Sequence, residues 1–133
     1  MDLGPRVLTG CALAAVIALV ALRARSLSPS GAIAAAIVGT VAVAAGWDWA
    51  LLLIAYFVSS TLLSRMGRHR KTEHTAGMTE KPGARDAWQV VSNGLPYTCA
   101  AAAAAMDLAR PELLMAVGAG SLAASAADTW ATE

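Results

Sequence analysis

The sequence predicts an all-α membrane protein, a polytopic helical bundle of about five transmembrane or partly inserted helices. Charged residues are only 14% of the chain, whereas ordinary soluble domains contain about 25%. Nearly all of these charges lie between long apolar runs, as a bilayer requires, because a charge in hydrocarbon is costly. The five runs are residues 7–22, 31–46, 47–64, 95–106 and 115–127.

The first run, residues 7–22, favours a membrane helix over two alternatives. A soluble Ala-rich bundle would need a polar face that repeats every three to four residues, but this run has polar or small breaks only at 9–11. A cleaved signal peptide would end in small residues, but Arg23 and Arg25 follow the run directly.

The fourth run, residues 95–106, is shorter than the roughly 20 residues that cross about 30 Å of hydrocarbon. Such a segment must borrow flanking residues, tilt little or enter the membrane partway. It begins with Pro96, which suits an early helix turn, and Tyr97, which suits the membrane interface. The alanines at 100–105 indicate close helix packing, so we expect a fourth helix here.

Basic residues predict the orientation of a multi-pass protein in the cell membrane. If the runs alternate in direction, eight basic side chains reach one side, and only Arg6 and Arg110 reach the other. The positive-inside rule makes the first side cytoplasmic and places the N-terminus outside. The eight are Arg23, Arg25, Arg65, Arg68, Arg70, Lys71, Lys81 and Arg85.

The connection at residues 65–94 is predicted to be a cytoplasmic loop with an interfacial helix. Residues 65–79 lack apolar periodicity, and their basic cluster would attract anionic lipid headgroups by about 1 kcal/mol per charge. Residues 84–93 can form a helix with one polar face, and Lys81 and Gly83 lie in a preceding turn whose backbone could cradle an anion. The alternative is an amphipathic helix whose charges are simply solvated. The polar face consists of Arg85, Asp86, Gln89 and Asn93.

The last run ends in the most informative residue, Asp128, which follows an apolar stretch rich in Ala, Gly and Ser. A carboxylate is costly to bury, so one in this position is normally kept for an ion, a partner or a reaction. Ser121 and Ser125 share its helix face and predict a polar seam toward the bundle interior. The alternatives are interhelical hydrogen bonds for the serines and an ion pair of Asp128 with Arg65 or Arg85.

Charge and cysteine usage bound the class of partner. A net charge of +1 argues against a nucleic-acid-binding protein and favours phosphate or anionic lipid as the target of the local basic cluster. Cys11 and Cys99 lie inside apolar runs without metal-ligand spacing. We therefore expect both cysteines to act as small hydrophobic side chains.

Four segments carry a resemblance to a known family. They are SPSGAIAAAIVGT at 28–40, FVSSTLLSR at 57–65, EKPGARDAWQVVSNG at 80–94 and GSLAASAADTWATE at 120–133. In this order they resemble the transmembrane protein 19 family of integral membrane proteins, which includes the plant phytyl-phosphate kinase. In relatives the last motif continues into a glycine turn and further membrane segments. We therefore expect residues 1–133 to be a single integral membrane domain and a C-terminally truncated fragment, the N-terminal half.

The resemblance implies, in at least the plant branch, transfer of a phosphoryl group from a nucleoside triphosphate to an isoprenoid monophosphate. Pro82 and Leu95 depart from the family pattern, which usually has glycines there, and Ala126 replaces a usual Asn. The matching positions are Glu80, Lys81, Gly83, Arg85, Asp86, Gln89, Asn93 and Gly94 in the third motif and Gly120, Ser121, Asp128, Thr129, Trp130 and Glu133 in the fourth.

A prenyl-phosphate kinase needs mainly positioning, a divalent cation and positive charge around the phosphates. The partners would be membrane lipid, a nucleotide and an isoprenoid phosphate whose tail enters the apolar seam. We expect the catalytic residues to be Asp128, Lys81 and Arg85, with phosphates held by the basic side chains. The substrate-binding residues would be Gln89, Asn93, Gly83, Ser121 and Ser125, and the Mg²⁺ ligands would be Asp128, Asp86 and Glu133.

Two non-catalytic functions remain open. A lipid-phosphate or ion transporter would use Asp128 as a carrier carboxylate, and a structural membrane subunit would need no site. Transport requires a polar path to both faces, but the outer halves of the runs offer only Thr9, Thr40 and Thr98. This asymmetry favours a one-sided site. Unpaired Gly- and Ala-rich helix faces would also allow an oligomer.

Overall fold

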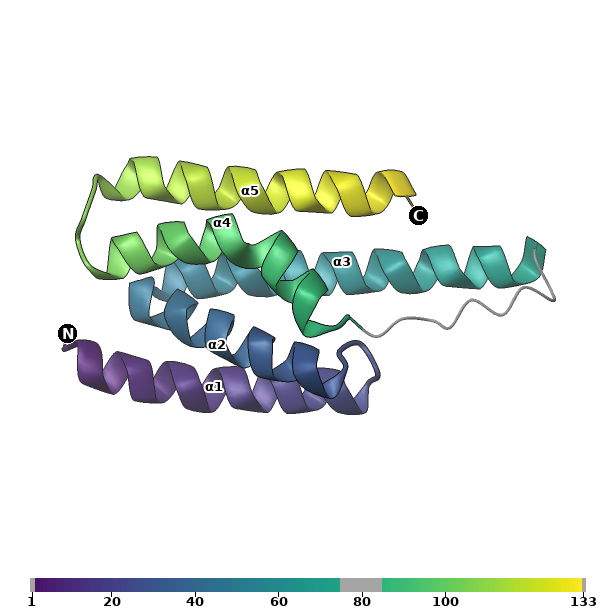
Figure 1. The fold of residues 1–133 in the computed structure, drawn as a ribbon, viewed down its shortest axis with the longest axis horizontal. Coiled ribbons are helices and arrows are strands. Elements are labelled where there is room, and N and C mark those ends of the chain that lie inside the picture. Colours follow the sequence, from purple (N-terminus) through teal and green to yellow (C-terminus); the bar gives the residue numbers. More distant parts are fainter. Residues whose placement is uncertain (1, 75–84, 133) are drawn as a thin grey trace.

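The computed structural model describes residues 2–74 and 85–132, and within these ranges the chain forms five helices (Figure 1). They are α1 (Leu3–Arg23), α2 (Pro29–Ala45), α3 (Trp47–His74), α4 (Ala87–Ala105) and α5 (Pro111–Thr132). Successive helices run antiparallel, so α1, α3 and α5 end where α2 and α4 begin (Figure 1). We call this the Arg85 end of the bundle. The predicted all-α helical bundle is confirmed.

The two helices that begin at the Arg85 end are each capped by a side chain. Ser28 Oγ accepts a hydrogen bond from Gly31 N at 3.1 Å, and Pro29 opens α2. Asp86 Oδ1 accepts one from Gln89 N at 2.9 Å and caps α4. Each cap satisfies a backbone N–H that has no partner within its own helix. Both helix starts are therefore fixed at this end.

α2 lies at the centre of the bundle, where it packs on α1, α3 and α4, while α5 packs on α4 and α3. Glycines bring α1 and α2 together. A Cβ on Gly10 would lie 2.8 Å from Val43 Cβ, and a Cβ on Gly39 would lie 2.8 Å from Ala14 Cβ. Side chains do not approach so closely, so glycine at both positions lets the backbones pack directly, as is common between membrane helices.

The core joins α2, α3, α4 and α5 around Tyr97, which is completely buried. Its ring lies 5.5 Å from that of Trp49, centroid to centroid, at an interplanar angle of 58°. The Tyr97 hydroxyl donates a hydrogen bond to the carbonyl oxygen of Trp49, which satisfies the polar end of the side chain. Tyr97 is therefore a core residue whose hydroxyl finds its partner inside the bundle, and its predicted place at the membrane interface stays a prediction.

Two helix boundaries differ from the sequence prediction. α3 continues to His74, so residues 65–74 are helical rather than loop. Their Arg, Lys, Met and Glu residues have good helix propensity, and a helix in water needs no apolar periodicity when it extends one already formed. α4 runs from Ala87 to Ala105, so the predicted interfacial helix at 84–93 and the fourth apolar run form one helix.

Pro96 lies inside α4 rather than in its first turn. Because proline has no N–H to donate and its ring crowds the preceding turn, helices bend at this residue, and α4 is visibly bent in Figure 1. Thr98 Oγ1 donates a 2.7 Å hydrogen bond to Gly94 O, a bond to the preceding turn that often accompanies a helix bend. The helix therefore continues through the proline, and its first half turns toward the start of α2.

The outer surface of the bundle carries large apolar side chains, which a lipid solvent accepts. Leu8 and Leu19 on α1 and Leu51 on α3 are each more than half exposed. Among the described helices, Leu3–Arg23 and Trp47–Gly67 are long and apolar enough to cross a membrane, and Pro29–Ala45 is a shorter apolar helix.

The α3–α5 contact predicts opposite effects at two nearby glycines. A Cβ on Gly118 would lie 2.6 Å from Trp49 Cζ3, whereas one on Gly120 would meet nothing within 4 Å. We expect Gly118→Ala to destabilise the detergent-solubilised protein by about 1–3 kcal/mol through overpacking. Gly120→Ala, the matched control, should be neutral or stabilise by up to about 1 kcal/mol, because alanine is the better helix former. Thermal unfolding checks this, and equal melting temperatures would contradict the contact.

Candidate functional site

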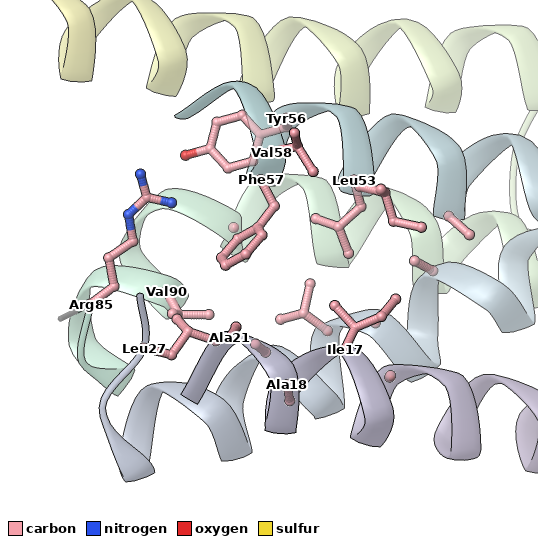
Figure 2. Close-up of a pocket in the computed structure, with 18 of the residues that line it drawn as sticks. Ile17, Ala18, Ala21, Leu27, Leu53, Tyr56, Phe57, Val58, Arg85 and Val90 are labelled. Carbon is pink, nitrogen blue, oxygen red and sulfur yellow. The ribbon is translucent and has the colours of Figure 1, made fainter. Parts of the chain in front are cut away.

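An apolar cavity of about 320 Å³ lies between α1, α2, α3 and α4 (Figure 2). Most of its lining comes from alanine, valine, leucine and isoleucine side chains of α1, α2 and α3. The wall that continues into the start of α4 is different, because Arg85, Gln89 and Asn93 line it beside Val90. The cavity therefore combines an apolar body with one polar edge.

Arg85 reaches this edge because its backbone pairs with the segment before α2. Leu27 and Arg85 form a parallel β-bridge. Ser28 N donates a hydrogen bond to Arg85 O at 3.0 Å, and Arg85 N donates one to Ser26 O at 3.1 Å. These bonds hold the main chain, so the Arg85 side chain starts from a fixed point beside the cavity.

A glycine in α2 makes this pairing possible. A Cβ on Gly31 would lie 2.0 Å from Arg85 O, which no side chain tolerates. Two serines extend the contact, because Ser28 Oγ lies 3.3 Å from Arg85 O and Ser30 Oγ accepts a hydrogen bond from Ala87 N at 3.3 Å. The first and third motifs of the family resemblance therefore meet in space.

Two arginine side chains lie at this end of the bundle. The Arg85 guanidinium lies over the Phe57 ring, 5.7 Å from its centroid, as a cation–π contact (Figure 2). Arg65 donates hydrogen bonds to Ala24 O at 2.7 Å and to Ser26 Oγ at 3.1 Å. Arg65 thus holds the loop whose Ser26 carbonyl accepts from Arg85 N. The second motif, which contains Phe57 and Arg65, joins the other two here.

The predicted polar face of residues 85–93 keeps most of its members together. Arg85, Gln89 and Asn93 line the cavity. Asp86 is exposed, and its carboxylate caps α4 through Gln89 N. Asp86 differs from the other three because it has extended backbone just before the first turn of α4. Its side chain therefore bonds to an N–H group of that turn and does not line the cavity. Asp86 therefore has a structural role, and its predicted metal-binding role stays a prediction.

The two serines of the predicted α5 seam both donate hydrogen bonds to main-chain carbonyl oxygens. Ser121 Oγ donates a 2.9 Å hydrogen bond to Gly118 O in its own helix. Ser125 Oγ donates a 3.1 Å bond to Asn93 O, which ties α5 to α4 and agrees with the alternative of interhelical bonding. The part of α5 that lines the cavity is Leu122. A substrate-binding role for either serine stays a prediction.

Asp128 is exposed, whereas the sequence predicted a buried carboxylate. α5 buries Leu122 and Ala126 against the bundle, and a residue two positions after Ala126 lies about 200° around the helix. Asp128 therefore lies outside the buried stripe of α5. It lies near the end of α5, which reaches the Arg85 end of the bundle (Figure 1).

Three predicted site residues, Lys81, Gly83 and Glu133, lie outside the described residues. Within residues 2–74 and 85–132, no three His, Cys, Asp or Glu side chains gather where a metal ion could bind. The Mg²⁺ site predicted from Asp128, Asp86 and Glu133 stays a prediction.

Sequence reasoning missed the residues that hold Arg85, namely Ser28, Ser30 and Gly31. The run of serine, proline and glycine is a recognisable helix start, but it does not show which distant segment pairs with it. Phe57 was missed because a phenylalanine in an apolar run resembles any other lipid-facing or core residue.

A helical bundle with an apolar exterior, small residues between its helices and an internal apolar cavity defines a polytopic integral membrane protein. The chain belongs to the integral membrane protein DUF92 family, whose model matches residues 12–133. This membership agrees with the resemblance carried by the four sequence motifs. No curated protein and no solved structure matches the chain.

Gly31→Ala should separate the Arg85 segment from α2, because the new Cβ would overlap Arg85 O. We expect faster hydrogen exchange at Ser28 N–H and Arg85 N–H, since both take part in the pairing. Gly4→Ala is the control, because a Cβ there meets nothing within 4 Å. Hydrogen–deuterium exchange measures both amides, and unchanged protection in Gly31→Ala would contradict the pairing.

Proposed function

We propose that the protein is a kinase of an isoprenoid monophosphate that uses a nucleoside triphosphate and produces the isoprenoid diphosphate. The observation that carries the proposal is the apolar cavity with Arg85 at its edge. An isoprenoid monophosphate has the same division, an apolar chain joined to an anionic group. The resemblance supplies the reaction, and the cavity supports the substrate class.

The body of the cavity suits a hydrocarbon tail. Its volume of about 320 Å³ is at the lower end of the roughly 300–1,000 Å³ found for small-molecule sites. Small side chains such as Ala14, Ala18 and Ala35 leave the space open. An apolar chain loses no hydrogen bonds on entering such a space, whereas a polar ligand would.

The polar edge suits a phosphate. The guanidinium of Arg85 presents forked donors that match phosphate oxygens, and Gln89 and Asn93 follow on successive turns of α4. Their amide groups would orient the phosphate. Lys81 and Asp128 complete the proposed site on the strength of the resemblance alone.

The proposed reaction depends mainly on positioning and charge. A phosphate oxygen of the isoprenoid monophosphate attacks the γ-phosphorus of the nucleotide. The new P–O bond replaces the bond to the β-phosphate oxygen, and the nucleoside diphosphate leaves. Positive charge at Arg85 would stabilise the oxygens that gain charge during the transfer.

We further propose that the Arg85 end faces the cytoplasm of a cell membrane, where nucleoside triphosphates are available. The positive-inside rule supports this orientation. Arg23 ends α1, Arg25 lies in the loop that follows, and Arg65 binds that loop, so all three lie at the same end as Arg85.

The kinase proposal predicts a large loss of activity at Arg85. Membranes containing the full-length protein, labelled nucleotide, Mg²⁺ and phytyl or geranylgeranyl monophosphate should form labelled lipid diphosphate. We expect Arg85→Gln to slow product formation by about 10²-fold, as when one preorganised charge-stabilising donor is removed. Asp128→Asn should also lose activity. Arg110→Gln, an exposed arginine before α5, is the control and should remain active.

Absence of the diphosphate with the unaltered protein, or equal product after Arg85→Gln and Asp128→Asn, would remove the kinase assignment. Lipid monophosphate that exchanges between leaflets without becoming phosphorylated would instead identify a carrier.

The orientation predicts opposite labelling of two loops. Ala24 follows α1 and Ala109 precedes α5, and both residues are exposed. In a protein whose Cys11 and Cys99 are replaced by serine, a membrane-impermeant maleimide should label Ala109→Cys from outside the cell, while Ala24→Cys should react only after the membrane is opened. Labelling of both from the same side would overturn the alternating arrangement.

A further inference from the structure

Three apolar side chains line the cavity and also reach the outer surface of the bundle. Ile17 on α1 is 37% exposed, and Ile54 and Val58 on α3 are 36% and 49% exposed. Other lining residues, such as Ala18 and Val38, are buried and do not reach the outer surface. Side chains that belong to both surfaces mark the rim of an opening.

The helix packing explains where this opening lies. α1 and α3 each pack on α2, and α2 also packs on α4. Figure 2 shows Ile17 on one side of the cavity and Leu53, Phe57 and Val58 on the other. α2 and α4 thus form the closed back of the cavity, and the slot between α1 and α3 opens on the face of the bundle that carries exposed apolar residues.

The depth of the slot corresponds to one leaflet. Lining residues run from 13 to 21 on α1, from 35 to 43 on α2 and from 50 to 58 on α3. A rise of eight residues along a helix is about 12 Å, less than half of the roughly 30 Å hydrocarbon core. Arg85 lies at one end of this span (Figure 2). If the phosphate of a lipid lies at Arg85, its tail extends into the adjacent leaflet over the same depth as the slot.

We infer that the lipid monophosphate enters sideways from the bilayer, its single tail passing between α1 and α3 beside Ile17, Ile54 and Val58 while its phosphate stays at Arg85. The identity of the lipid rests on the proposed function, and the inference adds the path by which this lipid reaches the cavity. Entry through water would expose the whole tail and lose its hydrophobic free energy, whereas sideways entry keeps the tail in apolar surroundings throughout. The small volume favours one chain over the two chains of a phospholipid.

Photolabelling in vesicles tests the route without any reaction. The full-length protein in phosphatidylcholine vesicles is illuminated with a hexadecyl monophosphate that carries a diazirine near the end of its tail, with no nucleotide present. We expect labelled peptides from residues 13–21 and 50–58, and loss of that labelling with excess unmodified hexadecyl monophosphate. Ile17→Trp and Val58→Trp should each abolish the competable labelling, because the larger ring fills the slot.

Matched controls lie on the same helices but outside the cavity. Leu19 on α1 and Leu62 on α3 are each 57% exposed, and Leu19→Trp and Leu62→Trp should retain competable labelling. Labelling that no competitor reduces, or that is equal in all four variants, would overturn the sideways route.

The two proposals fail separately. Competable labelling at the slot in a protein that forms no lipid diphosphate would remove the kinase and leave the route. Normal diphosphate formation by Ile17→Trp and Val58→Trp would keep the kinase and remove the route.

Discussion

The main-chain contact between Arg85 and the segment before α2 is the constraint on which the rest of the candidate site depends. It joins residues that are 57 positions apart in sequence, and it fixes the start of α4 against the start of α2. The Asp86 cap then sets the first turn of α4, and the cavity-facing positions of Gln89 and Asn93 follow from the helical repeat. Arg65 supports the arrangement from α3 by holding the loop that accepts the Arg85 N–H.

Small residues produce both a close helix contact and the apolar cavity of the bundle. Gly10 and Gly39 allow α1 and α2 to touch through their backbones. One turn further, Ala14 and Ala18 face a region where α3 does not close over them, so the same small size leaves a cavity. Packing in a membrane gains little from apolar contact alone, since lipid is equally apolar. A bundle can therefore keep an open apolar space that a lipid chain would occupy.

The features predictable from the sequence were those that one segment determines by itself. Long apolar runs fixed the approximate places of the helices, and Arg85, Gln89 and Asn93 were grouped because their spacing puts them along one local surface. The burial of Asp128 was predicted wrongly because α5 is rich in small apolar residues on all sides, so its sequence does not show which face is buried. The burial of Tyr97 in the core was missed for a related reason: its partner, the carbonyl of Trp49, lies on another helix. The cavity and the Gly31 contact depend on distant segments and had no local signal.

The attachment of residue 85 has a consequence for how such a protein can diversify. α2 and its preceding loop bind the amide and carbonyl of Arg85, groups that every residue except proline presents equally. The guanidinium takes no part in those bonds and lies over the Phe57 ring instead, so the main-chain pairing does not depend on which side chain stands at this position. A single codon change can exchange the charge at this edge of the cavity while the main-chain pairing is retained. Descendants of one ancestral bundle could therefore acquire different headgroup preferences without first passing through a misfolded intermediate.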